Sequence, residues 1–278
     1  MSRFARHIGI DYSGARTAED SLPGLRVYMA RIDSPPTEVA PPPSPRKYWT
    51  RRGLAHWLAA RLEEGPPTLV GVDHGFGFPL AYLERHRLGL GGTGADWTAN
   101  LEDFARHWPT DAPHTYVDFI RDGLVGDGAA RVGDSRWRRL CEQRARAKSI
   151  FHFDVQGAVA KSTHAGLPWL AFLRRRLGPR LHVWPFDGWS VPPGRSMIAE
   201  VYPALWSAGF PRENRTGDQH DAYALAARLS DADRAGDLEA WLTPRLAADE
   251  TALAAREGWI LGLGAESPGR QITSSRAD

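Results

Sequence analysis

The hydrophobic and polar positions of the chain form short runs that predict an α/β protein. Residues 8–12 and 25–32 are β-rich runs joined by a polar segment, which predicts an antiparallel pair of strands. Residues 68–73 are nearly all apolar, as is typical of a strand whose two faces are both covered. Further short strands are predicted at residues 181–186 and 197–201.

Other segments carry apolar residues at helical spacing. The predicted helices cover residues 51–63, 163–177, 218–229, 238–242 and 244–257. Thr163 is a candidate N-cap for the second of them, because its hydroxyl could accept a hydrogen bond from the first turn. Strands followed by strand–helix alternation indicate a mixed sheet flanked by helices.

The middle of the chain predicts an insertion of helical character at about residues 90–150. The helical pattern is found there at residues 96–108, 115–124 and 136–148. Residues 34–46 hold six prolines and predict an exposed, extended loop outside the core. We therefore expect a single domain over residues 1–263 and a disordered tail over residues 264–278.

The composition excludes several classes of protein. The only cysteine among 278 residues is Cys141, so the chain has no internal disulfide framework and no Cys-rich zinc site. No apolar stretch reaches the length of a membrane span, and the first residues lack the apolar core of a signal peptide. A cytoplasmic protein without a membrane partner is the expectation; the oligomeric state is left open.

The net charge is only +2, but basic residues are unevenly placed. The segment from Arg131 to Lys148 holds seven basic residues against two acidic ones, with Trp137 among them, and residues 174–176 are three consecutive arginines. Such stripes would suit a nucleic-acid backbone. A solvated helix face would have the same composition, and the sequence favours neither interpretation over the other.

Acidic residues occupy positions where the apolar pattern predicts hydrophobic ones. Asp11 and Asp73 each end an apolar run, and Glu200 interrupts a third run. Asp218 and Asp221 lie three residues apart on the first turns of a predicted helix, hence on one helical face. Burying several carboxylates together is costly unless a cation compensates their charge. Because ligands gather at the carboxyl ends of strands in such sheets, a divalent metal site is predicted there.

Each acid also has a simpler explanation when it is taken alone. Asp11 and Asp73 could be turn residues, Asp218 could be a helix N-cap, and Glu200 could be a charge on an edge strand. All of these positions lie at the ends of apolar elements, however, and one shared site explains them together.

The motifs around these acids resemble a known family. They are Gly-Ile-Asp at 9–11, Asp-His-Gly-Phe-Gly-Phe-Pro at 73–79, Glu-Val-Tyr-Pro at 200–203 and Asp-Gln-His-Asp-Ala at 218–222. In order and spacing they resemble the predicted ribonuclease H-like nuclease family called domain of unknown function 429. The resemblance extends over roughly residues 7–230. The proline-rich loop and the central insertion depart from it.

The resemblance implies a ribonuclease H-like fold and metal-dependent cleavage of phosphodiester bonds, with Asp11, Asp73, Glu200 and Asp221 as ligands. Mg²⁺ or Mn²⁺ fits such a site, since both prefer oxygen ligands. In a two-metal hydrolase, Asp11 would bridge the ions, Asp73 and Asp221 would complete the site, and Glu200 and Asp218 would be further ligands or neighbouring acids. RNA or DNA is the expected substrate.

Two other functions remain open at this point. The segment Gly-Ile-Asp-x-Ser-Gly at residues 9–14 would also suit the ATP-phosphate loop of an actin-like small-molecule kinase or ATPase, although no second phosphate motif follows it. A non-catalytic nucleic-acid-binding protein of the same fold is the other alternative.

Several smaller motifs have two interpretations each. His74 and His220 could bind metal or transfer protons, or could be hydrogen-bonded at the rim of the site. Residues 161–164 could contact a phosphate or could be an ordinary helix entry. The Gly-x-Gly-x-x-Gly segment at 89–94 follows a helix-like stretch, so a flexible flap is favoured over a dinucleotide loop. Trp97 or Trp137 could stack on bases, although most tryptophans should anchor the core.

Overall fold

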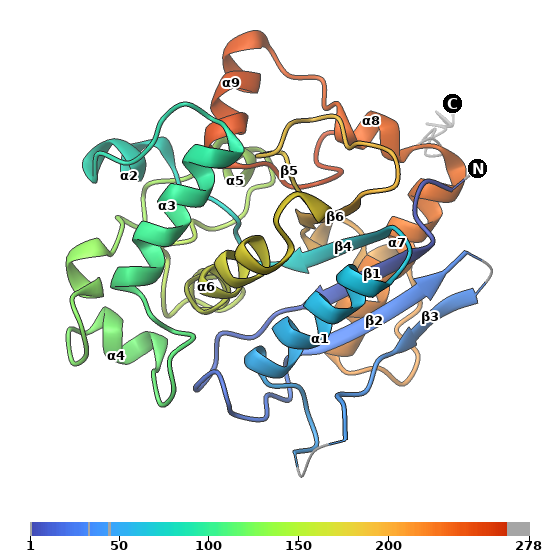
Figure 1. The fold of residues 1–278 in the computed structure, drawn as a ribbon, viewed down its shortest axis with the longest axis horizontal. Coiled ribbons are helices and arrows are strands. Elements are labelled where there is room, and N and C mark those ends of the chain that lie inside the picture. The colour runs from blue at the N-terminus through green and yellow to red at the C-terminus, as the bar shows by residue number, and fades with distance from the viewer. Residues whose placement is uncertain (1, 33, 44–45, 266–278) are drawn as a thin grey trace, which may run out of the picture.

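A six-stranded mixed sheet forms the centre of the computed structural model, which describes residues 2–32, 34–43 and 46–265 (Figure 1). The strands are β1 Arg6–Asp11, β2 Arg26–Arg31, β3 Ser34–Glu38, β4 Thr68–Asp73, β5 Leu181–Trp184 and β6 Ser196–Glu200. They lie in the order β3-β2-β1-β4-β6-β5. β2 pairs antiparallel with β1 and β3, whereas β1, β4, β6 and β5 run parallel. The predicted α/β class and the antiparallel start are therefore confirmed.

Helices cover both faces of this sheet. They are α1 Arg51–Glu64, α2 Leu80–Arg85, α3 Gly94–His107, α4 Val117–Arg121, α5 Leu140–Arg144, α6 Ala160–Leu177, α7 Gly217–Ala235, α8 Leu238–Leu242 and α9 Ala248–Glu257. Short 3₁₀ turns occur at η1 Gly128–Arg131, η2 Gly178–Arg180, η3 Pro203–Leu205 and η4 Ser207–Gly209. Helices α1 and α6 lie on one face and α7 on the other, while α3 to α5 lie beyond the carboxyl ends of the strands (Figure 1).

Glycine on β1 brings α7 unusually close to the sheet. A Cβ placed on Gly9 would lie 2.4 Å from the carbonyl oxygen of Ala222 and 2.5 Å from the amide nitrogen of Ala226. Both are backbone atoms of α7, so they cannot yield without moving the helix. Because Gly9 is two residues before Asp11, this contact holds the first turns of α7 near the end of β1.

We expect Gly9→Ala to destabilise the protein by about 1–3 kcal/mol or more, because the new methyl group has no space against backbone. Gly217→Ala is the matched control at the start of the same helix, where the nearest atom to a new Cβ is 4.0 Å away. The control should change the free energy of unfolding by less than about 1 kcal/mol. Urea unfolding of both variants measures this, and equal stabilities would contradict the close packing.

The proline-rich segment differs from the prediction at its start. Residues 34–38 form β3 at the edge of the sheet, with Glu38 opposite Tyr28 and a bulge between Met29 and Arg31. An edge strand tolerates Pro35 and Pro36 because one of its sides needs no N–H donors. Residues 34–38 are mostly exposed, as predicted, but they form a paired strand and not a loop.

Of the three helical segments predicted in the middle, the one at residues 96–108 is confirmed as α3, and the other two are shorter than predicted. The helix predicted at residues 163–177 begins earlier. Helix α5 covers only Leu140–Arg144 of the predicted 136–148, and α4 only Val117–Arg121 of 115–124. Helix α6 begins at Ala160, so Thr163 lies inside it and is not its N-cap. The Thr163 hydroxyl instead accepts a hydrogen bond from the amide of Gly75, which gives the side chain a partner outside its own helix.

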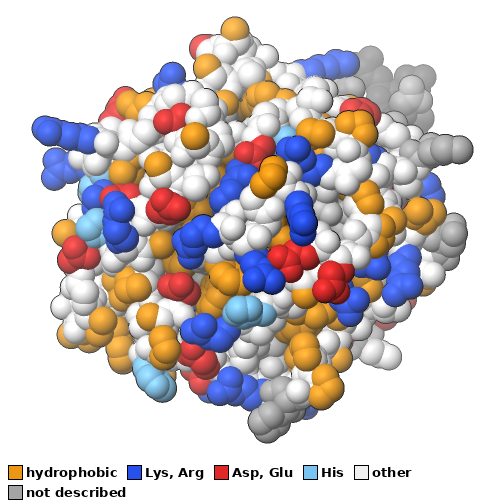
Figure 2. Space-filling view, in the orientation of Figure 1, with side chains coloured by type: hydrophobic (Ala, Val, Ile, Leu, Met, Phe, Trp, Pro, Cys, Tyr) orange, Lys and Arg blue, Asp and Glu red, His pale blue; other side chains and the backbone are white. Residues whose placement is uncertain are grey.

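Charges of both signs are interspersed on the face covered by α1 and α6 (Figure 2). Arg176 of the three-arginine run pairs with Glu63 of α1 at 2.8 Å, and Arg174 pairs with Asp187. These arginines join elements of the fold, which favours a structural explanation for the run. No helix in the described part of the chain combines the length and apolarity that a membrane crossing needs. The predicted tail falls mainly on residues 266–278, which lie outside the described residues.

Candidate functional site

Asp11 and Asp73 lie side by side at the carboxyl ends of neighbouring strands. They are register partners in the parallel pair β1–β4, two residues beyond the paired glycines Gly9 and Gly71. Paired residues of adjacent strands point to the same face of a sheet, and their Cα atoms are about 5 Å apart. Gly9 and Gly71 both lie against α7. The two carboxylates therefore share the face that α7 covers.

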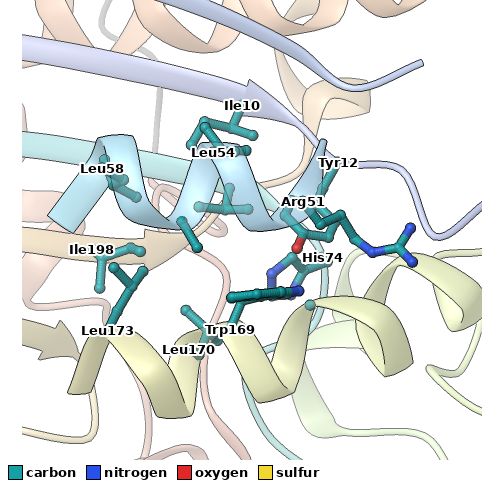
Figure 3. Close-up of a pocket in the computed structure, with 13 residues that line it drawn as sticks. Ile10, Tyr12, Arg51, Leu54, Leu58, His74, Trp169, Leu170, Leu173 and Ile198 are labelled. Atoms are coloured by element: carbon teal, nitrogen blue, oxygen red, sulfur yellow. The ribbon is translucent and has the colours of Figure 1, made fainter. Parts of the chain in front are cut away.

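The residues that follow the two aspartates confirm which face of the sheet the aspartates occupy. Tyr12 and His74 contact each other edge to face on the opposite side of the sheet, with ring centroids 4.7 Å apart. Both side chains line a small cavity of about 20 Å³ between α1 and α6 (Figure 3). Since side chains alternate along a strand, Asp11 and Asp73 must point the other way.

The first turns of α7 bring two further acids to this end of the sheet. Thr216 is the N-cap of α7 and accepts a hydrogen bond from the amide of Gln219, so Asp218 is not the cap. A Cβ on Gly24, just before β2, would be 3.5 Å from Oδ2 of Asp218 and 3.7 Å from Oγ of Ser13. Asp218 is thus close to the loop that follows Asp11. Asp221 accepts a 2.6 Å hydrogen bond from the hydroxyl of Ser207.

The electrostatics of these acids show that they act on one another. Burial and the neighbouring charges of Asp73, Asp218 and Asp221 raise the pKa of Asp11 well above its ordinary value. Burial, with the charges of Asp221 and Glu200, raises the pKa of Asp73 to about 8. Burial, together with the charge of Asp221, also raises the pKa of Asp218. A cluster of this kind favours binding of a proton or a metal cation.

Arg26 is the cation that opposes this repulsion. It is the register partner of Asp11 on β2, and its charge acts to lower the pKa of both Asp11 and Asp218. Its guanidinium also pairs with Glu38 at 2.9 Å and lies 4.8 Å from the ring centre of Tyr48. Nothing in the local sequence marks Arg26, because its role depends on the antiparallel register.

Glu200 lies next to Asp73, but its carboxylate is bonded to an arginine. Its register partner on β4 is Val72, not Asp73, yet it lines one pocket with Asp73 and Arg139 at the end of the sheet, and its charge acts to raise the pKa of Asp73. Both of its carboxylate oxygens bond to the guanidinium of Arg139, at 2.6 and 2.7 Å, and the amide of Phe76 donates to one of them. Glu200 is 4% exposed. The structure thus places it in a buried ion pair.

Among the described residues, no group of three or more His, Cys, Asp or Glu side chains is arranged as a ready metal-binding cluster. Asp11 and Asp73 are register partners, and the charges of Asp218 and Asp221 act on Asp11 from α7.

Both candidate histidines are bonded to backbone. His74 shares a hydrogen bond with the carbonyl oxygen of Gly75, and burial lowers its pKa to about 4, so it is neutral at pH 7. His220 bonds through Nε2 to the carbonyl oxygen of Ser207. These contacts agree with the hydrogen-bonded alternative that the sequence left open for both.

The basic run between Arg131 and Lys148 is largely engaged within the chain. Arg136 pairs with Asp134, and Arg144 with Glu250. Arg138 donates to backbone carbonyl oxygens, and Arg139 is buried with Glu200. Structural pairing therefore accounts for much of this stripe.

The remaining motifs take ordinary structural positions. The glycine-rich segment 89–94 follows α2 and ends at α3, whose N-cap is Thr93. Trp97 is 3% exposed and donates to the carbonyl oxygen of Phe76, so it cannot stack on a base in this conformation. Lys161 pairs with Asp118 at 2.9 Å.

Sequence reasoning missed a residue that holds the loop after β1. The buried Arg51, at the start of α1, donates to the carbonyl oxygens of Ser13, Ala15 and Arg16. Its position in an ordinary amphipathic helix gave no signal of this contact. Arg51 therefore fixes the loop that borders Asp11.

Comparisons of the chain with family models, with curated proteins and with solved structures find no match.

Proposed function

We propose that this protein is a metal-dependent nuclease that hydrolyses phosphodiester bonds of nucleic acid. The observation that carries the proposal is the register pair Asp11–Asp73 at the carboxyl edge of the sheet, on the same face as the first turns of α7. Two adjacent carboxylates with raised pKa values are unfavourable without a cation and point to a cationic ligand.

The strand order supports a ribonuclease H-like fold. Three antiparallel strands, β1 to β3, are extended by parallel β4 and β6 beyond β1, and α7 returns to pack on β1 and β2. This arrangement agrees with the resemblance that the motifs around Asp11 and Asp73 suggest. Strand β5, outside β6, and the helical segment at 90–150 would be additions to that fold.

The residues present suit a Mg²⁺ or Mn²⁺ ion that has only a few protein ligands. Mg²⁺ is usually held by one or two carboxylates together with waters and substrate phosphates, so a complete protein cage is not required. Asp11 and Asp73 would hold the ion, with Asp218 and Asp221 contributing from α7. When bound, such an ion activates water and stabilises charge on the phosphate oxygens.

The residues around the acids leave the site open to a substrate and supply positive charge. Asp218 is exposed and Asp11 and Asp73 are partly buried, so the acids form a site that is open at the N-terminus of α7. The positive end of that helix helps to accommodate the acids and an anionic substrate. Arg26 lies at the rim of the site, where a substrate phosphate could replace Glu38 as the partner of its guanidinium.

The test is an incubation of the purified protein with labelled RNA, DNA and RNA–DNA hybrid, with Mn²⁺, with Mg²⁺ and with chelator. We expect cleavage of at least one substrate that requires the ion. Asp231→Asn, on an exposed turn of α7 far from the acids, is the control that should keep full activity. Absence of cleavage with all substrates and both ions would contradict the proposal, and stabilisation by ATP instead would favour the kinase alternative.

Replacing Arg26 should strengthen metal binding. In Arg26→Gln, the cation that opposes the carboxylate repulsion is gone, so the site binds Mn²⁺ more tightly, by about three- to tenfold at low salt. Arg31→Gln, at the far end of the same strand, is the control. Mn²⁺ titration of the three proteins measures the effect, and weaker binding by Arg26→Gln would show that the arginine is not a competing charge.

A further inference from the structure

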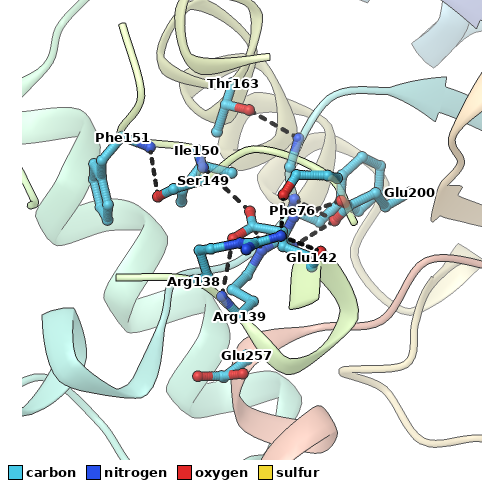
Figure 4. Close-up of polar contacts among 12 residues, drawn as sticks. Phe76, Arg138, Arg139, Glu142, Ser149, Ile150, Phe151, Thr163, Glu200 and Glu257 are labelled. Carbon is cyan, nitrogen blue, oxygen red and sulfur yellow. Dashed lines mark hydrogen bonds and ion pairs between the residues drawn. The ribbon is translucent and has the colours of Figure 1, made fainter. Parts of the chain in front are cut away.

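A buried polar network lies directly behind the turn that follows Asp73. Arg139 and Glu142 are each 1% exposed, Glu257 is 3% exposed and Glu200 is 4% exposed. The side chains come from α5 and its N-terminal flank, from α9 and from β6 (Figure 4). Four ionisable groups this deeply buried are expensive, and they persist only where hydrogen bonds satisfy them.

Arg139 connects the network. Its two terminal nitrogens bond to both oxygens of Glu200 at 2.6 and 2.7 Å, and its Nε bonds to Glu142 at 3.0 Å. Glu142 in turn accepts bonds from the amides of Arg139 and Ile150. All three nitrogens of the guanidinium donate a hydrogen bond, in a planar arrangement that a lysine in this position could not reproduce.

The network ends on the backbone next to Asp73. Glu200 accepts a hydrogen bond from the amide of Phe76 at 2.9 Å, and Thr163 of α6 accepts one from the amide of Gly75 at 2.9 Å. A Cβ on Gly75 would lie 2.6 Å from Ile150 and 3.3 Å from Arg139. The turn is thus held between side chains that belong to other elements.

Glu257 attaches the same region to the C-terminal helix. Its two oxygens accept bonds from the amides of Leu80, at the start of α2, and Leu140, at the start of α5. Glu257 therefore fixes the backbone next to Arg139, and Arg139 in turn holds the carboxylate of Glu200.

We propose that Arg139 is a positioning residue, which fixes the turn after Asp73 through Glu200 and so sets the geometry of the proposed metal site from outside the sheet. The inference rests on the proposed function for the ligand, but the clamp on residues 74–76 can be measured without it. Groups that orient metal ligands from behind commonly change metal affinity by 10- to 100-fold when they are removed.

The experiment compares Arg139→Met, the double variant Arg139→Met with Glu200→Met, and the control Arg144→Met. Arg144 belongs to α5 as well, but its pair with Glu250 is partly exposed. The double variant removes both charges of the Arg139–Glu200 pair, so neither partner of that pair is left buried alone. Glu142 loses its bond to the guanidinium but keeps the hydrogen bonds from the backbone amides of residues 139 and 150, so folding should be preserved. It still removes the acceptor for the amide of Phe76.

Two measurements are made on each protein: hydrogen exchange of the peptide that covers residues 73–79, and Mn²⁺ affinity. We expect exchange in this peptide to become at least about tenfold faster and Mn²⁺ binding at least about tenfold weaker in the double variant. Exchange across β1 and β2 should stay unchanged, and Arg144→Met should match the wild type in both measurements.

A merely stabilising pair predicts a different result. In that case the double variant, once folded, would keep wild-type protection of the turn and wild-type Mn²⁺ affinity, and the inference would be overturned. If the wild type itself bound no Mn²⁺, the proposed function would fail, and exchange at residues 73–79 alone would then decide whether Arg139 holds the turn.

Discussion

Asp73→Asn and Asp11→Asn should each reduce metal-dependent cleavage by about 10²–10³-fold or more, the scale seen when one preorganised electrostatic group is removed from an active site. In the proposed site these register partners would be the ligands of the ion, so an amide at either position removes a charged ligand while keeping the shape. Initial cleavage rates on the best substrate, at saturating Mn²⁺, measure the loss.

The control for these variants is Glu200→Gln. Since both carboxylate oxygens of Glu200 are bonded to Arg139, this change should weaken activity less than either aspartate variant. A larger loss for Glu200→Gln than for Asp73→Asn would show that the predicted ligand role of Glu200 was correct after all. Full activity in Asp11→Asn would contradict the assignment of Asp11 to the active site.

The second large effect is on stability as a function of pH. The pKa of Asp73 is raised to about 8 in the folded protein, from an ordinary value of 3.8. Between these values the folded state binds a proton that the unfolded state has released. Without metal, Asp73 therefore contributes a free energy of unfolding that falls as the pH rises, by up to about 1.4 kcal/mol per pH unit.

Asp73→Asn removes this dependence. Relative to the wild type in chelator, the variant should gain stability steadily between about pH 5 and pH 8, by a total on the order of 2–4 kcal/mol. Urea unfolding at each pH measures the difference, with Asp231→Asn as the control. A constant difference across this range would show that Asp73 is already ionised at pH 5.

Divalent ions should reverse the instability. In the wild type, Mn²⁺ at 100 times its dissociation constant adds about 2.7 kcal/mol to the free energy of unfolding, because it binds only the folded protein. At a fixed Mn²⁺ concentration the gain should grow from pH 6 to pH 8 as the proton on Asp73 leaves, and it should vanish in Asp73→Asn. Thermal unfolding with and without Mn²⁺ provides this measurement.

The sequence predicted the two central acids because their signal is local. Asp11 and Asp73 each interrupt an apolar run at its end, and two parallel strands with such ends bring the residues together at one edge. The helix with Asp218 and Asp221 was also predictable from its spacing, although Thr216 just before it supplies the cap.

Glu200 shows where local pattern fails. Its run has the same form as the other two, yet β6 pairs with β4 so that Glu200 is level with Val72. A shift of one residue in register changes the face of every side chain, and register is set by contacts that lie far apart in the sequence. No periodicity within residues 197–201 contains that information.

The basic run shows the same limit for charge. Arg139 belongs to a run whose composition is that of a solvated stripe. It is nevertheless only 1% exposed, because the carboxylates of Glu142 and Glu200 pair with its guanidinium. Likewise, Thr163 was placed as a helix cap from its position before an apolar stripe, whereas its partner is the amide of Gly75 in another element. Partners separated by 60 or more residues cannot be identified from one sequence without a fold.

The most direct measurement is a titration of the wild-type protein with Mn²⁺ at pH 8, following free Mn²⁺ by electron paramagnetic resonance, next to the double variant Asp11→Asn with Asp73→Asn. We predict saturable binding of at least one ion by the wild type and none by a folded double variant. Equal binding by both proteins, or none by the wild type, would contradict the assignment of these two aspartates to a metal site.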